Sequence, residues 1–297
     1  MYRCIDAFFA ERGVMRVDTS LLSVAAGTDP CIEPWTAVGQ PARYLQTSPE
    51  FQMKRLLAAG SGPIYQIAPV FRQEERGRWH EPEFRMLEWY RPGWYHHALM
   101  DEVAELLGAL FPSLPTQVRR VTYADAFREF TGLEADERGE APLRSACARG
   151  GVDAPSACTP GEMHDLLLAT MVTPKLGIDA PCFLYDFPAD KAALARIRDG
   201  SPPVAERFEL FLSGIELANG FHELTDANEQ RARFVADQQL RARQGLPQRP
   251  MDEALLDALA AGLPACAGVA LGLDRLLALA LGKSAVSEVI AFPADRA

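Results

Sequence analysis

Apolar and polar residues follow each other along this chain with two spacings, one typical of helices and the other of strands. Residues 2–13 carry apolar positions at helical spacing and end at Gly13, which predicts a first helix. Ser48 as an N-cap and Pro49 at the first helical position predict a second helix, over 51–59. The same criteria predict further helices near 98–110, 226–244 and 251–262, and strands at 14–19, 64–72, 84–91 and 206–224. Within 268–282 they predict a strand that breaks into an apolar helix.

These elements indicate an α+β fold with a mixed, mainly antiparallel sheet flanked by helices. The strands at 64–72 and 84–91 predict a hairpin with a long, charged tip, because polar residues separate them. A turn is expected at Ser213-Gly214. Because the chain has no internal repeat or clear linker, we expect one domain over 1–297, with a helical insertion of weak signal at about 112–200.

Composition excludes several classes of protein. The 297 residues include 30 basic and 40 acidic side chains, and the net charge of −10 argues against binding nucleic acid or an anionic membrane by bulk attraction. The six cysteines are scattered without a C-x-x-C pair, which favours a reducing compartment over a disulfide framework or zinc site. The most apolar stretch, 262–282, is interrupted by Asp274 and Arg275, so we expect a soluble, cytoplasmic protein.

The predicted hairpin carries the first candidate chemistry. Strand alternation places Phe84, Glu88 and Tyr90 on one face, a combination that plain packing does not require. Charged residues surround the hairpin mouth and tip: Arg72, Glu74, Arg78 and His80. Since arginine binds phosphate bidentately and an aromatic ring stacks on a base, this mixture suits a nucleotide polyphosphate. The alternative is a charged, solvated hairpin tip.

A second cluster lies in 206–224. Carboxylates on adjacent strands can hold Mg²⁺ through oxygen, and Glu209 and Glu216 are candidates. Pure alternation puts Asn219, Phe221 and Glu223 on the face opposite to Glu216. Convergence therefore requires a bulge or kink, which we expect near Gly220. The alternative is an edge strand with outward-facing acids.

The remaining signals are weaker. In GVALGLDRLL (268–277), Gly268 and Gly272 would permit close approach of the backbone to a ligand, and Arg275 in the first helical turn favours an anion as its partner. His96 and His97 have no partner at ligand spacing and indicate a surface pair. Four arginines in 226–244 indicate a solvated face, with a docking patch as the alternative: Arg231, Arg233, Arg241 and Arg243.

In this order, the three clusters resemble the catalytic core of the class II aminoacyl-tRNA synthetases. VFRQEERGRWHEPEF (70–84) resembles the second motif of that class, and GVALGLDR (268–275) resembles the third. RVDTSLL (16–22) resembles the first motif, which implies a homodimer, although Ser20 stands where that motif has proline. The lysine subgroup is the most similar one, on three segments: TSPEFQMKRLL, EPEFRMLEWYRP and ERFELFLSGIELANGFHELTD.

Two features point to the elongation factor P–(R)-β-lysine ligase family (EpmA, PoxA or GenX) within this subgroup. The core begins at residue 1 without an anticodon-binding domain, and Ala270 stands where lysyl-tRNA synthetases have glycine. GLPQRP and SEVIAFPADRA are also similar to that family. The N-terminus is shorter than usual in the family, and Glu81 replaces its asparagine. The resemblance implies activation of (R)-β-lysine or lysine with ATP and transfer to a lysine side chain of elongation factor P.

The resemblance also assigns roles residue by residue. It implies catalytic roles for Arg72, Glu216 and Arg275, and Mg²⁺ binding by Glu209 and Glu216. The amino acid would contact Ser48, Pro49, Glu50, Glu88, Tyr90, Asn219 and Glu223. ATP would contact Arg72, Gln73, Glu74, His80, Glu81, Phe84, Glu216, Leu217, Gly272 and Arg275.

Three alternatives remain open. One is a stand-alone lysyl-tRNA synthetase-like enzyme that charges tRNA, against which the missing anticodon domain and Ala270 count. Another is a catalytically silent regulatory paralogue, which would have no need of all four of these residues: Arg72, Glu74, Glu216 and Arg275. The third is ammonia-dependent asparagine synthetase, which shares the fold of this class. Its substrate carries a single positive charge and fits the three candidate carboxylates poorly: Glu50, Glu88 and Glu223.

Overall fold

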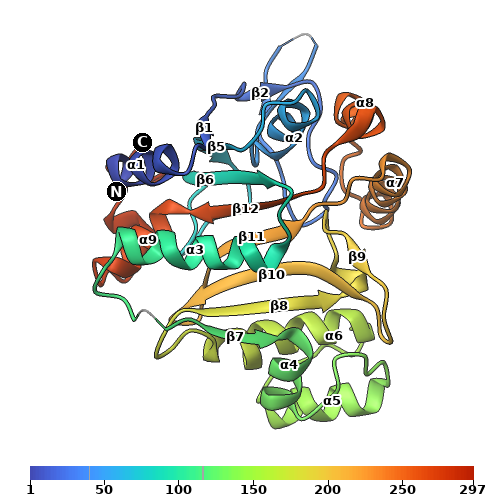
Figure 1. Cartoon of the computed structure of the whole chain (residues 1–297). Coiled ribbons are helices and arrows are strands. Elements are labelled where there is room, and N and C mark those ends of the chain that lie inside the picture. Colours follow the sequence, from blue (N-terminus) through green and yellow to red (C-terminus); the bar gives the residue numbers. More distant parts are fainter. Residues whose placement is uncertain (40, 116) are drawn as a thin grey trace. The chain divides into compact units, whose positions relative to one another are not determined.

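The computed structural model describes residues 1–39, 41–115 and 117–297. Contacts group the chain into two compact units, one made of Met1–Tyr95 with Glu223–Ala297 and the other of His96–His222. No helix in the described ranges is long and apolar enough to cross a membrane. We describe each unit separately (Figure 1).

The first unit contains five α-helices, seven strands and a 3₁₀ turn within its described residues. The helices are α1 (Tyr2–Glu11), α2 (Glu50–Ala58), α7 (Ala227–Arg243), α8 (Glu253–Gly262), α9 (Leu273–Ala280) and the 3₁₀ turn η4 (Val286–Glu288). The strands are β1 (Met15–Arg16), β2 (Leu22–Ser23), β3 (Thr36–Ala37), β4 (Arg43–Leu45), β5 (Ile64–Phe71), β6 (Glu83–Pro92) and β12 (Cys266–Gly272).

Strands β1, β5, β6 and β12 lie in this order, and only the short β1 pairs in parallel. The predicted hairpin is β5–β6, in full antiparallel register from Ile64 opposite Tyr90 to Phe71 opposite Glu83. Helix α1 covers one face, because Phe9 stacks on Tyr65 at 4.5 Å and meets Trp89 edge-on at 5.4 Å. The opposite face of β6 is thereby left for Glu88 and its neighbours.

The α-helices of the second unit are α3 (His96–Leu110), α4 (Tyr123–Thr131), α5 (Glu140–Arg149) and α6 (Pro160–Leu167). It also has a π-helical turn, η1 (Leu168–Val172), and two 3₁₀ turns, η2 (Thr173–Lys175) and η3 (Ala189–Lys191). Its strands are β7 (Arg119–Thr122), β8 (Cys182–Pro188), β9 (Ile197–Arg198), β10 (Val204–Leu212) and β11 (Ile215–His222). Its strands lie in the order β11, β10, β8 and β7, and β9 pairs with β10. The segment 112–200, expected to be helical, thus also supplies three strands. The predicted turn joins β10 to β11, with positive φ at Ser213 and Gly214.

A bulge in β11 determines which acids share a face. Glu209 of β10 pairs with Asn219, whereas the residue two positions further along β10 pairs with Glu216. Three residue steps in β11 thus match two in β10, so one residue, Leu217, is extra. This extra residue turns Glu216 to the face of Glu209 and Asn219. The expected bulge therefore exists, but its placement near Gly220 is wrong, because the register with β10 decides its position.

Candidate active site

Ser48 connects the start of α2 to the carboxylate of Glu88 on β6. Its hydroxyl accepts a hydrogen bond from the backbone N–H of Glu50 at 3.0 Å and donates one to Glu88 Oε2 at 2.6 Å. The Tyr90 hydroxyl donates to Glu88 Oε1 at 2.6 Å. Both oxygens of this buried carboxylate are therefore held in place, which fixes it beside the first turn of α2.

Three acids and one lysine form what we call the acidic cluster: Glu50, Glu88, Glu223 and Lys54. Lys54 Nζ lies 2.7 Å from Glu50 Oε1 and 2.6 Å from Glu223 Oε2. The Lys54 side chain is only 2% exposed, and that of Glu223 only 1%. Lys54 was missed from the sequence, although its spacing of four residues from Glu50 on one helix was visible.

Burial and mutual repulsion shift the pKa values within the acidic cluster. Burial, and then the charge of Glu50, raise the pKa of Glu88 to about 7. Burial raises the pKa of Glu223 to about 8, opposed by Lys54 and supported by Glu50 and Glu88. The pKa of Lys54 is raised, because two carboxylates outweigh its burial. A single lysine does not neutralise three carboxylates, so the cluster favours further cations.

Strand β12 borders the acidic cluster with small residues. Gly268 pairs with Tyr90, and a Cβ atom at Gly268 would overlap the Tyr90 ring and Glu223 Oε1. Ala270 pairs with Glu88 and lies on the same face. At Gly268 the neighbours that approach the backbone closely are two candidate substrate-binding side chains, whereas the approach of a ligand stays a prediction.

The predicted phosphate-binding cations converge on a residue that the sequence did not single out, Glu75. Arg72 Nη1 lies 2.9 Å from Glu75 Oε1, while Arg275 Nη2 and His80 Nε2 lie 3.7 and 3.8 Å from Glu75 Oε2. We call Arg72, His80 and Arg275 the cationic cluster. The Arg72 guanidinium also lies 5.2 Å from the centre of the Phe84 ring. Cations beside an aromatic face suit a nucleotide.

Two contacts join the hairpin to the start of α9. Asp274 Oδ2 accepts a hydrogen bond from the backbone N–H of Arg85 at 2.7 Å. Arg275 Nε donates to the carbonyl of Trp79 at 2.9 Å. The second and third predicted motifs are therefore held together, and Arg275 lies in the first helical turn as expected.

The other candidate ATP residues of this unit differ in exposure and orientation. Gln73 and Glu74 are exposed beside Arg72, and Gly272 is the N-cap of α9. The carboxylate of Glu81 accepts a hydrogen bond from the backbone N–H of Ala294 at 3.0 Å. Glu81 therefore binds the C-terminal segment with its side chain.

In the second unit, Glu209, Glu216 and Asn219 share one face of the β10–β11 pair. Arg207 Nη2 donates to Glu209 Oε1 at 2.5 Å, and its Nε donates to Asn219 Oδ1 at 3.3 Å. Burial, opposed by Arg207 and supported by Glu216, raises the pKa of Glu209 to about 7. Two neighbouring carboxylates fit a hard cation such as Mg²⁺, although Arg207 binds one oxygen of Glu209. Leu217, the extra residue of the bulge and a candidate ATP contact, is buried.

Comparison with known proteins identifies relatives that match almost the whole chain. The family described as tRNA synthetases class II (D, K and N) matches residues 1–296. Elongation factor P–(R)-β-lysine ligases of Salmonella dublin, Salmonella paratyphi B and Salmonella heidelberg are each 48% identical to this chain, over 99% of it and 92% of the relative. The chain belongs to the elongation factor P–(R)-β-lysine ligase family.

Membership of the ligase family confirms the predicted fold class, a class II synthetase-like α+β core with a mixed, mainly antiparallel sheet and flanking helices. It also makes the chain a ligase of the class II synthetase type.

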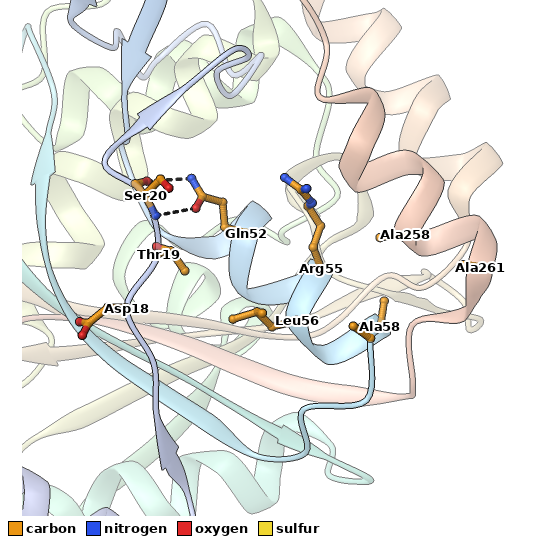
Figure 2. A pocket seen from close by; sticks show the side chains of 10 residues that line it. Asp18, Thr19, Ser20, Gln52, Arg55, Leu56, Ala58, Ala258 and Ala261 are labelled. Atoms are coloured by element: carbon orange, nitrogen blue, oxygen red, sulfur yellow. Dashed lines mark hydrogen bonds between the residues drawn. The ribbon is translucent and has the colours of Figure 1, made fainter.

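A groove lies beside the first motif, residues 16–22 (Figure 2). Residues 18–20, α2 and α8 line it. The Ser20 backbone N–H donates to Gln52 Oε1, and Gln52 Nε2 donates to the Ser20 carbonyl, both at 2.8 Å. Proline at position 20 would lack this N–H, so the departure from the motif creates a two-bond contact to α2.

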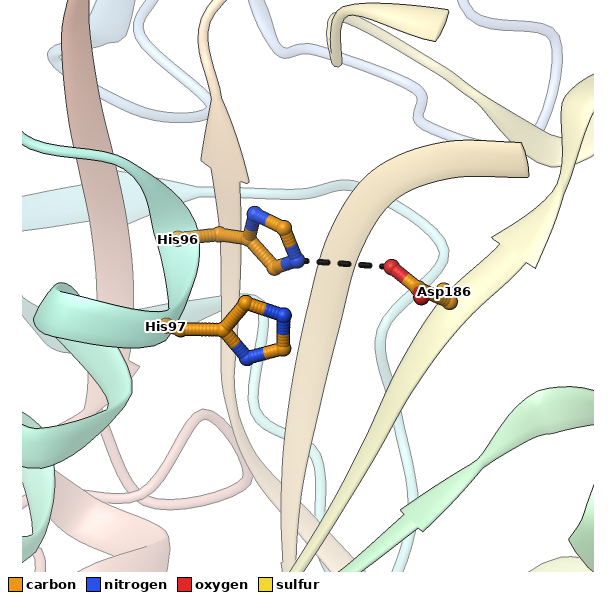
Figure 3. Close-up of side chains that lie close together, drawn as sticks. All are labelled: His96, His97 and Asp186. Atoms are coloured by element: carbon orange, nitrogen blue, oxygen red, sulfur yellow. Dashed lines mark ion pairs between the residues drawn. The ribbon is translucent and has the colours of Figure 1, made fainter. Parts of the chain in front are cut away.

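Two expectations outside the acidic and cationic clusters are wrong. His96 is buried, not at the surface, and its Nε2 lies 3.4 Å from Asp186 Oδ1 (Figure 3), a neighbour far along the chain. Although His96, His97 and Asp186 have metal-ligand spacing, Arg198 binds Asp186 Oδ2 at 2.6 Å, and we assign an ion-pair network.

The arginines of α7 do not form one solvated face. Arg241 is fully buried, and its Nη2 lies 3.3 Å from Glu33 Oε2. Arg249, in the turn after α7, binds the same carboxylate. The loop that precedes β3 covers Arg241, and the polar pattern of α7 gave no sign of this cover.

Proposed function

We propose that this protein activates (R)-β-lysine with ATP as an adenylate and transfers the β-lysyl group to a lysine side chain of elongation factor P. The supporting observation is the buried acidic cluster, whose charge matches a substrate with two ammonium groups. The names of the Salmonella relatives, at 48% identity over almost the whole chain, support the choice of acceptor and amino acid.

Residues of the first unit have complementary roles in adenylate formation. Glu50, Glu88, Tyr90 and Glu223 hold the ammonium groups, and Ser48 and Pro49 border them. Phe84 stacks on adenine, while the cationic cluster, Gln73, Glu74 and Gly272 hold the nucleotide. The carboxylate oxygen of the amino acid attacks the α-phosphorus in line, the bond to the β-phosphate oxygen breaks, and pyrophosphate leaves. Arg72 and Arg275 stabilise the charge that develops on the phosphates.

Glu209 and Glu216 are the residues that would hold Mg²⁺, and Asn219 would face the substrate carboxylate. When bound, Mg²⁺ neutralises charge on the phosphates. Binding there requires Arg207 to share or release the carboxylate of Glu209.

In the second step, the deprotonated side-chain amine of the acceptor lysine attacks the adenylate carbonyl. An amide bond forms, AMP leaves with the electron pair of the broken C–O bond, and the amine loses its second proton to solvent. The transfer needs no protein nucleophile, because the adenylate is already activated.

We also propose a homodimer through the first motif and a cytoplasmic location. The six cysteines are scattered along the sequence without a C-x-x-C pair, which fits a reducing compartment. Sedimentation equilibrium measures the subunit number directly.

ATP–pyrophosphate exchange tests the proposed activation. We expect exchange that depends on (R)-β-lysine or α-lysine and on Mg²⁺, and that is lost in Arg275→Ala. Absence of exchange with every diamino acid would favour the silent paralogue and contradict the proposal. Exchange with aspartate or asparagine alone would return the chain to the asparagine synthetase alternative.

A further inference from the structure

We propose that Lys54 is a positioning and specificity residue, the third cation that makes the acidic cluster neutral when a diamino acid is bound. This inference rests on the proposed function and assigns a residue that the family motifs left without a role. Lys54 Nζ contacts Glu50 and Glu223 at 2.7 and 2.6 Å from inside the protein.

The argument starts from a count of charges. The cluster presents three carboxylates on three separate segments: Glu50 on α2, Glu88 on β6 and Glu223 after β11. A diamino acid brings two ammonium groups, and its own carboxylate is engaged by the nucleotide. Two ammonium groups leave one carboxylate uncompensated, and Lys54 supplies the missing cation. A substrate with a single ammonium group leaves one of these acids without a cation, so that acid keeps its proton, one ion pair is lost and the substrate binds more weakly.

The second step concerns geometry. Lys54 bridges the first turn of α2 and the segment after β11, so it fixes two carboxylates that the sequence places far apart. Glu223 cannot relax toward β12, because its Oε1 already lies against Gly268. The Lys54 side chain is 2% exposed, so water cannot replace its ammonium group easily.

The third step concerns protonation. The ionisable groups that interact with Lys54 are Glu50 from α2, Glu88 from β6, Glu223, and the thiol of Cys266 from β12. The Tyr90 hydroxyl donates a hydrogen bond to Glu88. Lys54 lowers the pKa values of Glu88 and Glu223 against burial. Without Lys54 these carboxyl groups stay protonated up to a higher pH. In the protonated form they carry no charge and do not attract an ammonium group.

The test compares Lys54→Met, Lys54→Arg and the exposed control Lys175→Met in ATP–pyrophosphate exchange between pH 6 and 9. For Lys54→Met we expect KM for (R)-β-lysine to rise on the order of tenfold or more, with KM for ATP unchanged. The acid limb of kcat/KM should move up by about one pH unit. In Lys54→Arg the acid limb of kcat/KM should return to its wild-type position, and Lys175→Met should match the wild type throughout.

A wild-type measurement covers the case in which Lys54→Met does not fold. The chain has only four lysines, so ¹⁵N-lysine labelling resolves the Lys54 ammonium signal, assigned with Lys→Arg variants at the other three positions. We expect this signal to move on addition of (R)-β-lysine but not of 3-aminohexanoic acid, which has one amine.

Two results would overturn the assignment of Lys54. One is an unchanged Lys54 signal with saturating (R)-β-lysine. The other is a Lys54→Met variant that keeps its acid limb and loses affinity for both substrates alike, as a purely structural lysine would. If the wild-type protein itself shows no exchange with a diamino acid, the proposed function fails instead.

Discussion

Glu75 Oε1 lies 2.9 Å from Arg72 Nη1, and the second oxygen of the same carboxylate faces Arg275 and His80. A single acid therefore gathers all three side chains of the cationic cluster. A triphosphate that binds these cations competes with Glu75, so the carboxylate has to turn away when the nucleotide enters.

Glu75→Gln should therefore lower KM for ATP, by about threefold to tenfold for the loss of a partly exposed carboxylate that competes for all three cations. KM for the amino acid should not change, because Glu75 does not contact the acidic cluster within the described contacts. Exchange kinetics at varied ATP measure both values. Glu83→Gln, which removes an exposed ion pair to Arg85, is the matched control. A higher KM for ATP would show that Glu75 assists the nucleotide.

Arg275→Ala should reduce kcat for adenylate formation by roughly a hundredfold to a thousandfold, because a positioned cation then no longer meets the phosphates. Glu216→Ala should have an effect of similar size through the loss of a Mg²⁺ ligand. Single-turnover adenylate formation measures both. Unchanged rates in either variant would contradict its assigned role.

Glu81 stands where the family has asparagine, and its carboxylate binds the backbone N–H of Ala294. We therefore expect Glu81→Asn to change KM for ATP less than twofold, and to lower the melting temperature slightly by loosening the C-terminal segment. Differential scanning fluorimetry and exchange kinetics provide the two readouts. A large change in KM with unchanged melting would place the side chain on the nucleotide.

The acidic cluster predicts a pH dependence of stability with a defined sign. The pKa of glutamate in an unfolded chain is about 4.3, whereas burial raises the pKa of Glu88 to about 7 and that of Glu223 to about 8 in the folded protein. Between these values the folded state binds more protons, so stability falls as pH rises from about 5 to 8. Melting of the wild type should fall more steeply over this range than that of Glu223→Gln. Equal slopes would show that Glu223 is already ionised at pH 5.

Substrate binding should depend on pH in the opposite direction: it should strengthen as pH rises, whereas the stability of the free protein falls. Since the carboxylates must be ionised to hold ammonium groups, (R)-β-lysine should raise the melting temperature more at pH 8 than at pH 6. Titration calorimetry near pH 7 in buffers of different ionisation enthalpy should detect proton release on binding. Binding without proton release would mean that the acids are ionised beforehand.

The local pattern predicted most of the elements around the site. The second helix was expected over 51–59 and is Glu50–Ala58, and the hairpin strands differ from expectation by one residue or two. Alternation correctly placed Glu88 and Tyr90 on one face, because strand periodicity is a property of the backbone. Strands β7 and β8 were missed, because a short apolar run such as Cys182–Pro188 does not reveal its period.

Features made by distant segments could not be predicted. Lys54 meets Glu223 only because α2 and the segment after β11 come together, and Glu75 gathers Arg275 from a remote helix. The bulge at Leu217 follows from pairing with β10, which β11 alone does not encode. Burial of Arg241 likewise depends on Glu33, in a loop from the other end of the chain.

The most direct test of the account is acceptor choice. The purified protein would be incubated with ATP, Mg²⁺ and (R)-β-lysine in the presence of both elongation factor P and lysine tRNA. Intact mass of the factor and acid-precipitable tRNA would be read together. We predict a gain of one β-lysyl unit on the factor, absent when its acceptor lysine is replaced by arginine, with uncharged tRNA. Charged tRNA with an unmodified factor would contradict the account.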